Sequence, residues 1–214
     1  DVPTVIVTDP EMMKIATSLR KGDMVDVKGV LSTREVKKTS ICQCGHKNSV
    51  LGNYAFISPI YMCRREPELS EIQGMEMLKK RGEVSNQILL IGGVCREPEY
   101  FKGEKGIAIT QYQLAVNRKY HIRDGHEQET ADYPWIKSIS FQAEEDHIRL
   151  KLGSIVHING AIQTREIKRT TVCENCQNEY EWGETVSEIV PYSVEYLRNC
   201  YFEPKPDGKT EDTD

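Results

Sequence analysis

Residues 22–29, Gly-Asp-Met-Val-Asp-Val-Lys-Gly, read like residues 153–160, Gly-Ser-Ile-Val-His-Ile-Asn-Gly. The likeness continues without a gap, and from Gly22 to Cys42 nine of 21 positions are identical to their counterparts. Chance supplies a few identities but not an unbroken run of this quality. The chain is therefore predicted to be a tandem duplication in which both copies share one fold.

Each copy reads as mostly strand with one short helix. In the second copy, strand-like runs over 87–94, 107–117, 133–141 and 154–162 are predicted to be strands, with a helix over 143–150 before the fourth strand. The first copy repeats the later part, with a strand over 2–7, a helix opened by Asp9-Pro10-Glu11 and a strand over 23–31. A short helix between the third and fourth of five strands is typical of the OB-fold. We expect an all-β protein of two tandem OB-fold barrels, each with this helix.

The duplication also sets the domain boundaries. We expect a first OB-fold over 1–65, a linker over 66–85, a second OB-fold over 86–202 and an acidic disordered tail over 203–214. The second copy has 46 residues, 86–131, before its counterpart of Asp1. The first barrel therefore lacks its first two strands here, and we expect about as many residues to precede Asp1 in the complete protein, or another source of strands.

Composition excludes several classes of protein. The 214 residues are 38% hydrophobic and 29% charged, which excludes collagen-like and fully disordered chains. There is no signal-like leader and no apolar run long enough to span a membrane, so a cytoplasmic, nucleoid-associated protein is expected. The net charge of -5 argues weakly against a nucleic-acid binder, but the tail alone carries five acids and two lysines. No hydrolase, phosphate-loop or zinc-protease motif occurs, so no enzymatic activity is expected.

The second copy resembles the bacterial single-stranded DNA-binding proteins. Three stretches carry the resemblance, namely 86–94 with the turn Glu97-Pro98-Glu99, then 112–118 (Tyr-Gln-Leu-Ala-Val-Asn-Arg), and 151–156 with Gly160. It covers about residues 86–202, and the repeat extends it to 1–65. It is closest to members with two OB-folds in one chain. It departs from the family in the cysteines after each fourth strand and in lacking the acidic-aromatic tip that recruits partner proteins.

A single-strand binder needs aromatic rings for the bases and cations for the phosphates. Trp135 and Phe141 are six residues apart, so on one strand they would share a face. The resemblance makes them stacking residues, whereas barrel core is the alternative reading of both. Tyr112 begins the family's signature strand and is a further candidate.

Three groups of basic residues lie at equivalent barrel positions. The predicted phosphate contacts are Arg34, Lys37 and Lys38 in the first copy, Arg165, Lys168 and Arg169 in the second, and Arg118 and Lys119 with Tyr120 after the second strand. Each group alone is more typical of a solvated surface, but three groups at equivalent barrel loops favour phosphate contact.

Cysteines occupy the tip of the hairpin that follows each fourth strand. Zinc requires four ligands in a tetrahedron, and each tip supplies two, Cys42 with Cys44 and Cys173 with Cys176. Either these four share one zinc ion, or each hairpin closes its own site with His46 and Cys63 in the first copy and Cys200 in the second. Cys95 is expected to be a core thiol.

These features predict a protein that coats and protects single-stranded DNA without sequence specificity, in replication, recombination, repair or mobile-element processing. Its expected partners are single-stranded DNA, possible replication or recombination proteins and a second copy of the chain. The alternative is a zinc-linked OB-fold subunit that docks onto a replication or transcription machine.

Overall fold

The computed structural model describes residues 1–65, 70–81, 86–118 and 130–198. The second repeat forms a closed barrel from β3 (Ile88–Val94), β5 (Ala108–Asn117), β7 (Trp135–Ile139), β8 (Ile155–Val172) and β9 (Glu179–Arg198). The strand order is β3-β8-β9-β7-β5, and pairing of β3 with β5 closes the circle. Helix α3 (Phe141–Arg149) lies between the third and fourth of these strands, as the OB-fold prediction requires.

Two short strands complete this repeat. β4 (Glu99–Lys102) extends β5 as a hairpin, and β6 (Ala131–Asp132) pairs with the end of β5. The core is made of the inward-facing side chains of the five barrel strands, such as Leu90, Leu114, Ile136 and Ile158. Their alternation with exposed residues is the period of two that a half-buried strand shows.

The first repeat consists of α1 (Pro10–Ser18), β1 (Val25–Ile41) and β2 (Lys47–Arg64). Asp9 caps α1, because its carboxylate accepts hydrogen bonds from the backbone N–H groups of Glu11 and Met12. A parallel bridge joins Val5 to Ile57, and the second repeat has the equivalent parallel pair between Ile136 and Ile189. The first repeat therefore reproduces the second half of the barrel architecture.

Both repeats share a bulge on their fourth strand. The register shifts at Gly29 in β1 and at Gly160 in β8. A Cβ at Gly29 would lie 2.5 Å from the carbonyl oxygen of Ser58, and one at Gly160 would lie 2.4 Å from that of Val190. A side chain cannot fit at either bulge, which explains why glycine stands at both positions.

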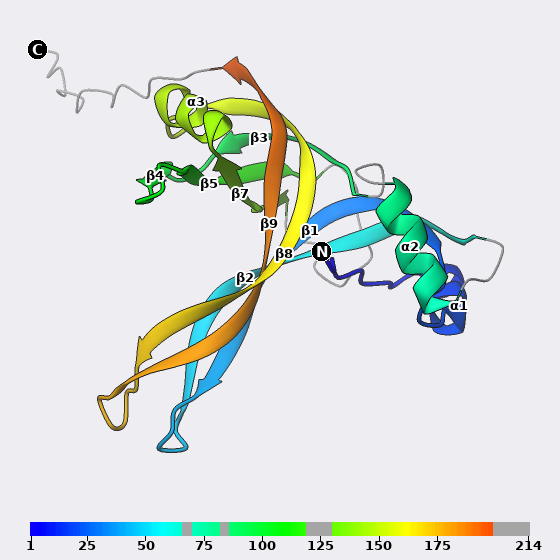
Figure 1. Ribbon diagram of the computed structural model, residues 1–214, viewed down its shortest axis with the longest axis horizontal. Coiled ribbons are helices and arrows are strands. Elements are labelled where there is room, and N and C mark those ends of the chain that lie inside the picture. The colour runs from blue at the N-terminus through cyan, green and yellow to red at the C-terminus, as the bar shows by residue number, and fades with distance from the viewer. Residues whose placement is uncertain (66–69, 82–85, 119–129, 199–214) are drawn as a thin grey trace, which may run out of the picture.

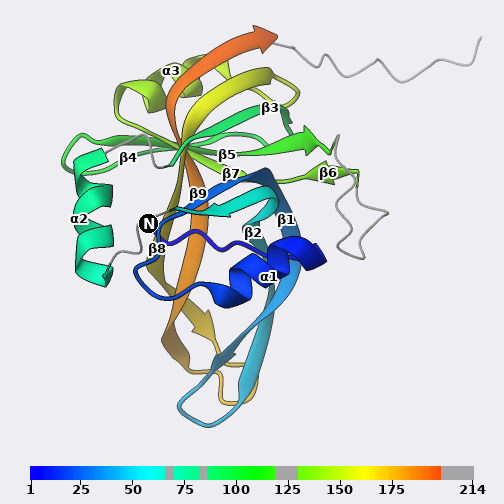
Figure 2. The same cartoon turned by 90° about the vertical axis from the view of Figure 1, so that its right-hand side faces the viewer.

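The long hairpins are the main departure from the expected strands. The strand expected over 23–31 continues as β1 to Ile41, and the strand expected over 154–162 continues as β8 to Val172. Figures 1 and 2 show the β1–β2 and β8–β9 hairpins leaving the barrel region together, with their tips close to each other. Each hairpin is stabilised beyond the barrel by its contact with the other.

Helix α2 (Glu71–Arg81) lies in the segment predicted to be a linker. It packs on the turn of the first repeat, where a Cβ on Gly74 would lie 2.8 Å from the carbonyl oxygen of Gly22, and Glu71 pairs with Lys21 at 2.8 Å. Within the described part of the chain, no helix is both long enough and apolar enough to cross a membrane. The tail expected over 203–214 lies outside the described residues.

Candidate nucleic-acid interface

A groove of about 1220 Å³ runs along the junction of the two repeats. One wall comes from β1 and β2 of the first repeat, and the other comes from β5, β7, β8 and β9 of the second. Charged, amide and aromatic side chains line it, among them Arg34, Glu35, Asn53, Arg96, Glu99, Tyr133, Trp135, Arg165, Arg169, Glu184 and Glu188. The groove therefore depends on both copies of the duplication.

Hydrogen bonds between the repeats fix the walls of this groove. The Asp132 carboxylate accepts from the backbone N–H of Thr33 at 2.6 Å, and the Thr33 hydroxyl accepts from the N–H of Tyr133 at 2.7 Å. The side-chain amide of Asn53 donates to the Tyr133 carbonyl at 2.7 Å. Since Thr33 and Asp132 are both buried, these bonds are shielded from water and hold β1 against the second barrel.

Aromatic rings line the floor of the groove. Trp135 lies at the start of β7, half-buried, and the Arg96 guanidinium lies 5.7 Å from its ring centroid. Tyr133, two residues earlier, is 45% exposed. Residues two apart on an extended chain face the same side, so both rings are directed to the groove.

Two buried carboxylates hold a row of cations along the groove. Glu184 accepts hydrogen bonds from both Lys38 and Arg169, one from each repeat. Glu188 binds Arg165 through two hydrogen bonds of 2.8 and 2.9 Å and lies 3.8 Å from the Lys137 ammonium. Since each carboxylate is shared by two cations, the cluster keeps an excess of positive charge.

The cysteines form a second cluster, at the hairpin tips. The sulfur atoms of Cys42, Cys44, Cys173 and Cys176 all lie within 4.8 Å of one another. The Cys42 and Cys176 sulfurs are 3.6 Å apart, and the Cys44 and Cys173 sulfurs are 3.7 Å apart. Tetrahedral ligands at the usual zinc–sulfur distance lie about 3.8 Å from each other. These four residues can therefore hold one metal ion between the hairpins.

Buried polar contacts support the cysteine cluster. The Tyr180 hydroxyl lies 2.6 Å from the Ser40 hydroxyl and accepts a hydrogen bond of 2.7 Å from the side-chain amide of Asn48. Trp182 packs against the cluster and donates its indole N–H to Thr171. These contacts hold the tips of the two hairpins against each other.

The hairpin loops give two of the thiols opposite acidities. At Cys173, a hydrogen bond from the Cys176 backbone N–H is the largest cause of a pKa lowered to about 6. At Cys42, a backbone hydrogen bond from Cys44 lowers the pKa, but burial and the neighbouring sulfurs outweigh it and raise the pKa to about 12. Cys173 is therefore the more acidic of these two thiols, and a divalent cation bound at the cluster would displace the proton that Cys42 holds.

Comparison with known proteins finds a match to one family model and to several bacterial relatives. Residues 85–181 match the model of the single-strand binding protein family. The single-stranded DNA-binding protein of Staphylococcus aureus MRSA252 is 29% identical over 126 residues, which cover 59% of this chain and 70% of that protein. Single-stranded DNA-binding protein A of Bacillus subtilis 168 is 28% identical over 125 residues, or 58% of this chain and 62% of that protein.

A likeness to solved structures extends beyond residues 85–181. The wild-type single-stranded DNA-binding protein from Thermus aquaticus has a TM-score of 0.58 to this structure at 15% sequence identity. The superposition covers 95% of this chain and 72% of that chain. The likeness in fold therefore includes the first repeat as well as the second.

The structure brings part of the predicted binding set to the groove. Trp135, Arg34, Arg165 and Arg169 line it, and Lys38 joins through Glu184. Lys37 is exposed on β1, and Lys168 is exposed on β8, 3.5 Å from Glu181. Lys119 and Tyr120 lie outside the described residues.

Two residues of the predicted binding set, Tyr112 and Arg118, lie in buried positions instead of lining the groove. Tyr112 is fully buried and donates to Asp146 at 3.2 Å, and burial raises its pKa. We therefore assign Tyr112 to the core, because a ring with no exposed surface offers no face to a base. Arg118 binds Asp132 at 2.6 Å with a side chain only 8% exposed, so it supports the junction between the repeats.

Phe141 does not share a strand face with Trp135, contrary to the prediction. β7 ends at Ile139, and Ser140 adopts a positive φ of 56° that turns the chain into α3. Phe141 is the first residue of that helix and is 74% exposed. The two aromatic residues therefore belong to different elements.

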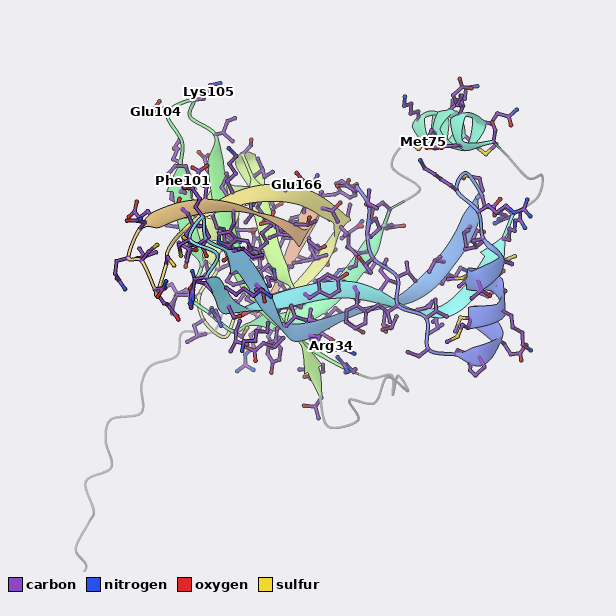
Figure 3. The ribbon with its side chains drawn as sticks, turned by 90° about the horizontal axis from the view of Figure 1, so that it is seen from below. Arg34, Met75, Phe101, Glu104, Lys105 and Glu166 are labelled. Carbon is purple, nitrogen blue, oxygen red and sulfur yellow. The ribbon has the colours of Figure 1, made fainter. Side chains whose placement is uncertain are left out.

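Sequence reasoning missed two residues of the groove that come from the second repeat. Tyr133 could have been found from its spacing of two from Trp135, which gives both the same face of a strand. Arg96 follows β3 and gives no periodic signal, so only the fold brings it to Trp135. Figure 3 shows Arg34 on the opposite side of the view from Phe101, Glu104 and Lys105. The exposed Phe101 ring therefore lies apart from Arg34 and its part of the groove.

The alternative ligands for separate metal sites lie away from the cluster or are not described. Cys63 is on β2, where its thiol donates to the carbonyl of Arg64. His46 contributes its backbone carbonyl to the turn that starts at Cys42. Cys200 lies outside the described residues. Cys95 follows β3, is half-buried and donates to the carbonyl of Gln113, rather than lying inside an apolar strand.

The ion pairs of Glu184 lead us to expect that the stability of the fold depends on pH. Burial alone would raise the pKa of Glu184, but hydrogen bonds from Lys38 and Arg169 outweigh burial and lower it below its ordinary value of 4.5. A carboxylate with a depressed pKa stabilises the fold fully above its unfolded-state value and loses that contribution as pH falls through the folded-state value. In thermal unfolding from about pH 6 to 3, Glu184→Gln should lose less stability than the unchanged protein.

The matched control for this change is Glu166→Gln, since Glu166 is exposed on β8. That variant should follow the unchanged protein across the same pH range. Equal pH dependence of Glu184→Gln and the unchanged protein would contradict the role given to Glu184.

Proposed function

We propose that this chain binds single-stranded DNA without sequence specificity along the groove between its two repeats. The observation that carries the proposal is the combination, in one groove, of the Trp135 and Tyr133 rings with a row of cations from both repeats. The family model that residues 85–181 match and the names of the bacterial relatives support the same function.

The mechanism follows from the chemistry of the groove. Bases stack on Trp135 and Tyr133, and stacking tolerates any sequence because every base has a π-face. Phosphates are contacted by the groove arginines Arg34, Arg96, Arg165 and Arg169. The carboxylates of Glu184 and Glu188 hold the cations in place without neutralising all of them, so the phosphates meet positioned donors.

The biological setting follows from non-specific binding. A protein that coats exposed single strands protects them during replication, recombination, repair or the transfer of mobile elements. It acts in the cytoplasm, where single strands of the nucleoid are exposed, and its task is binding rather than catalysis.

We also propose zinc as the metal of the cysteine cluster. Four thiolates are the ligands that zinc prefers in closed structural sites, and the two close sulfur contacts match the tetrahedral spacing. Cys42, Cys44, Cys173 and Cys176 would hold the ion, and its contribution would be to fasten the two hairpins that form the groove. The expected content is one zinc ion per chain rather than one per hairpin.

Binding of oligo-dT should depend strongly on salt. Three to four phosphate contacts in single-stranded DNA release enough counterions to lower affinity roughly 40- to 150-fold between about 50 and 300 mM salt. Fluorescence anisotropy of labelled oligo-dT measures this slope. Unchanged affinity over that range would contradict the proposal.

Two charge variants separate groove contacts from general attraction. Arg96→Gln removes an exposed cation beside Trp135 and should make the salt dependence shallower by about one contact. Lys105→Gln removes an equal charge from the β4–β5 turn, which lies away from Arg34 in Figure 3. This variant should leave the salt dependence of binding unchanged. Equal effects of the two variants would place DNA elsewhere.

A further inference from the structure

The close sulfur contacts in the cysteine cluster join different hairpins. The sulfur of Cys42, just after β1, is 3.6 Å from that of Cys176, after β8, and the sulfurs of Cys44 and Cys173 are 3.7 Å apart. Each of these pairs therefore contains one residue from each copy of the duplication. Such an arrangement allows a second chemistry besides metal binding.

We propose that a hydroperoxide oxidises these four cysteines to two disulfides between the hairpins, Cys42–Cys176 and Cys44–Cys173. The inference concerns the reactivity of the cluster and does not depend on DNA binding. Disulfide bonds require a sulfur separation near 2.05 Å, so each pair has to close by about 1.6 Å. Rotation about the side-chain bonds of the loop cysteines supplies a movement of this size.

Exposure sets the order of the reaction. Cys44 is exposed, whereas Cys42 and Cys173 are 4% and 0% exposed. The Cys44 thiolate attacks a peroxide oxygen, the O–O bond breaks, and water leaves after protonation. The Cys173 sulfur then attacks the Cys44 sulfenic acid, which forms the S–S bond and releases a second water.

The other pair reacts in the same way. Cys176 is half-buried and meets the second peroxide, and Cys42 resolves its sulfenic acid. In total, four thiolates, two molecules of hydrogen peroxide and four protons give two disulfides and four waters. Each sulfur is oxidised by one electron, and both peroxides are reduced. The sulfurs then no longer serve as thiolate ligands, so a bound divalent cation is released.

The pairing determines the outcome for the fold. Disulfides within each hairpin would leave the two tips unconnected once the metal is gone. Disulfides between the hairpins replace the metal by covalent links. The hydrogen bonds of Tyr180 with Ser40 and Asn48, which join the two hairpins, are then kept. The cluster thus keeps the hairpins tied in both redox states.

Peptide mapping of the full metal-loaded chain tests the proposal. Trypsin places Cys42 and Cys44 together in the peptide 39–47, and Cys173 and Cys176 together in 170–198. After treatment with hydrogen peroxide, the two peptides should appear as one cross-linked species under non-reducing conditions, with release of the metal. Separate peptides with internal disulfides, or cysteines oxidised to sulfinic acid, would overturn the proposal.

Single substitutions resolve the pairing. Cys44→Ser should retain the cross-link through Cys42 and Cys176, and Cys95→Ser should behave like the unchanged protein. A cross-link from Cys42 to Cys173 in Cys44→Ser would overturn the assigned pairs. The mapping of the unchanged chain remains decisive if Cys44→Ser does not fold, and none of these results depends on whether the groove binds DNA.

Discussion

Replacing Trp135 with alanine should lower the affinity for oligo-dT by roughly 5- to 150-fold. Stacking of one base on an aromatic ring contributes about 1–3 kcal/mol, and the Trp135 ring lines the groove beside the Arg96 guanidinium. Trp135→Phe keeps an aromatic face and should restore most of the affinity. Fluorescence anisotropy of labelled oligo-dT measures all three proteins.

The control for this prediction is Trp182→Phe. Trp182 packs at the cysteine cluster, where its indole N–H is bonded to Thr171. This substitution should leave the affinity for oligo-dT within about twofold. An undiminished affinity of Trp135→Ala, with circular dichroism unchanged, would remove Trp135 from the binding site.

Replacing Cys173 with serine should abolish metal binding rather than halve it. The four sulfurs lie within 4.8 Å of one another, so one ion needs ligands from both hairpins. Loss of a buried ligand removes the metal's contribution to folding and should lower the unfolding midpoint by roughly 10 °C. Elemental analysis and thermal unfolding measure the two effects.

Matched variants distinguish a shared site from separate sites. Cys42→Ser, in the other hairpin, should lose the metal as completely as Cys173→Ser does. Cys95→Ser lies outside the cluster and should keep one ion per chain. If Cys42→Ser and Cys173→Ser each retained half of the metal, the single shared ion would be wrong.

The duplication made much of this fold predictable. Because the two copies align without a gap, the glycine bulges lie at equivalent positions of β1 and β8, and the cysteines lie at equivalent hairpin tips. The cysteines could be grouped before their distances were known, since equivalent loops of two similar hairpins are alike in length and chemistry. The order of strands and helix in the second repeat likewise followed from its hydrophobic periodicity.

Orientation within elements was harder to predict. Tyr112 lies on β5, where Thr110, Tyr112 and Leu114 all face the core, and the sequence alone does not say which face of that strand is buried. Phe141 was misplaced because the turn at Ser140 depends on a positive φ at a residue other than glycine.

The lengths of the hairpins and the partners of the cations were set by tertiary contacts. The outer parts of β1 and β8 are rich in basic and polar residues, a pattern typical of a solvated surface. Their stability comes from the opposite hairpin, through contacts such as Lys38 with Glu184 and Ser40 with Tyr180. Pairs separated by this many residues leave no local signal in the sequence.

The most direct test of the central claim is a fluorescence titration of Trp182→Phe with oligo-dT. The chain has two tryptophans, so Trp135 in the groove becomes the sole indole emitter. We expect strong quenching that saturates with bound DNA and is reversed by raising the salt concentration. Binding of oligo-dT by anisotropy without any change in Trp135 emission would contradict the account.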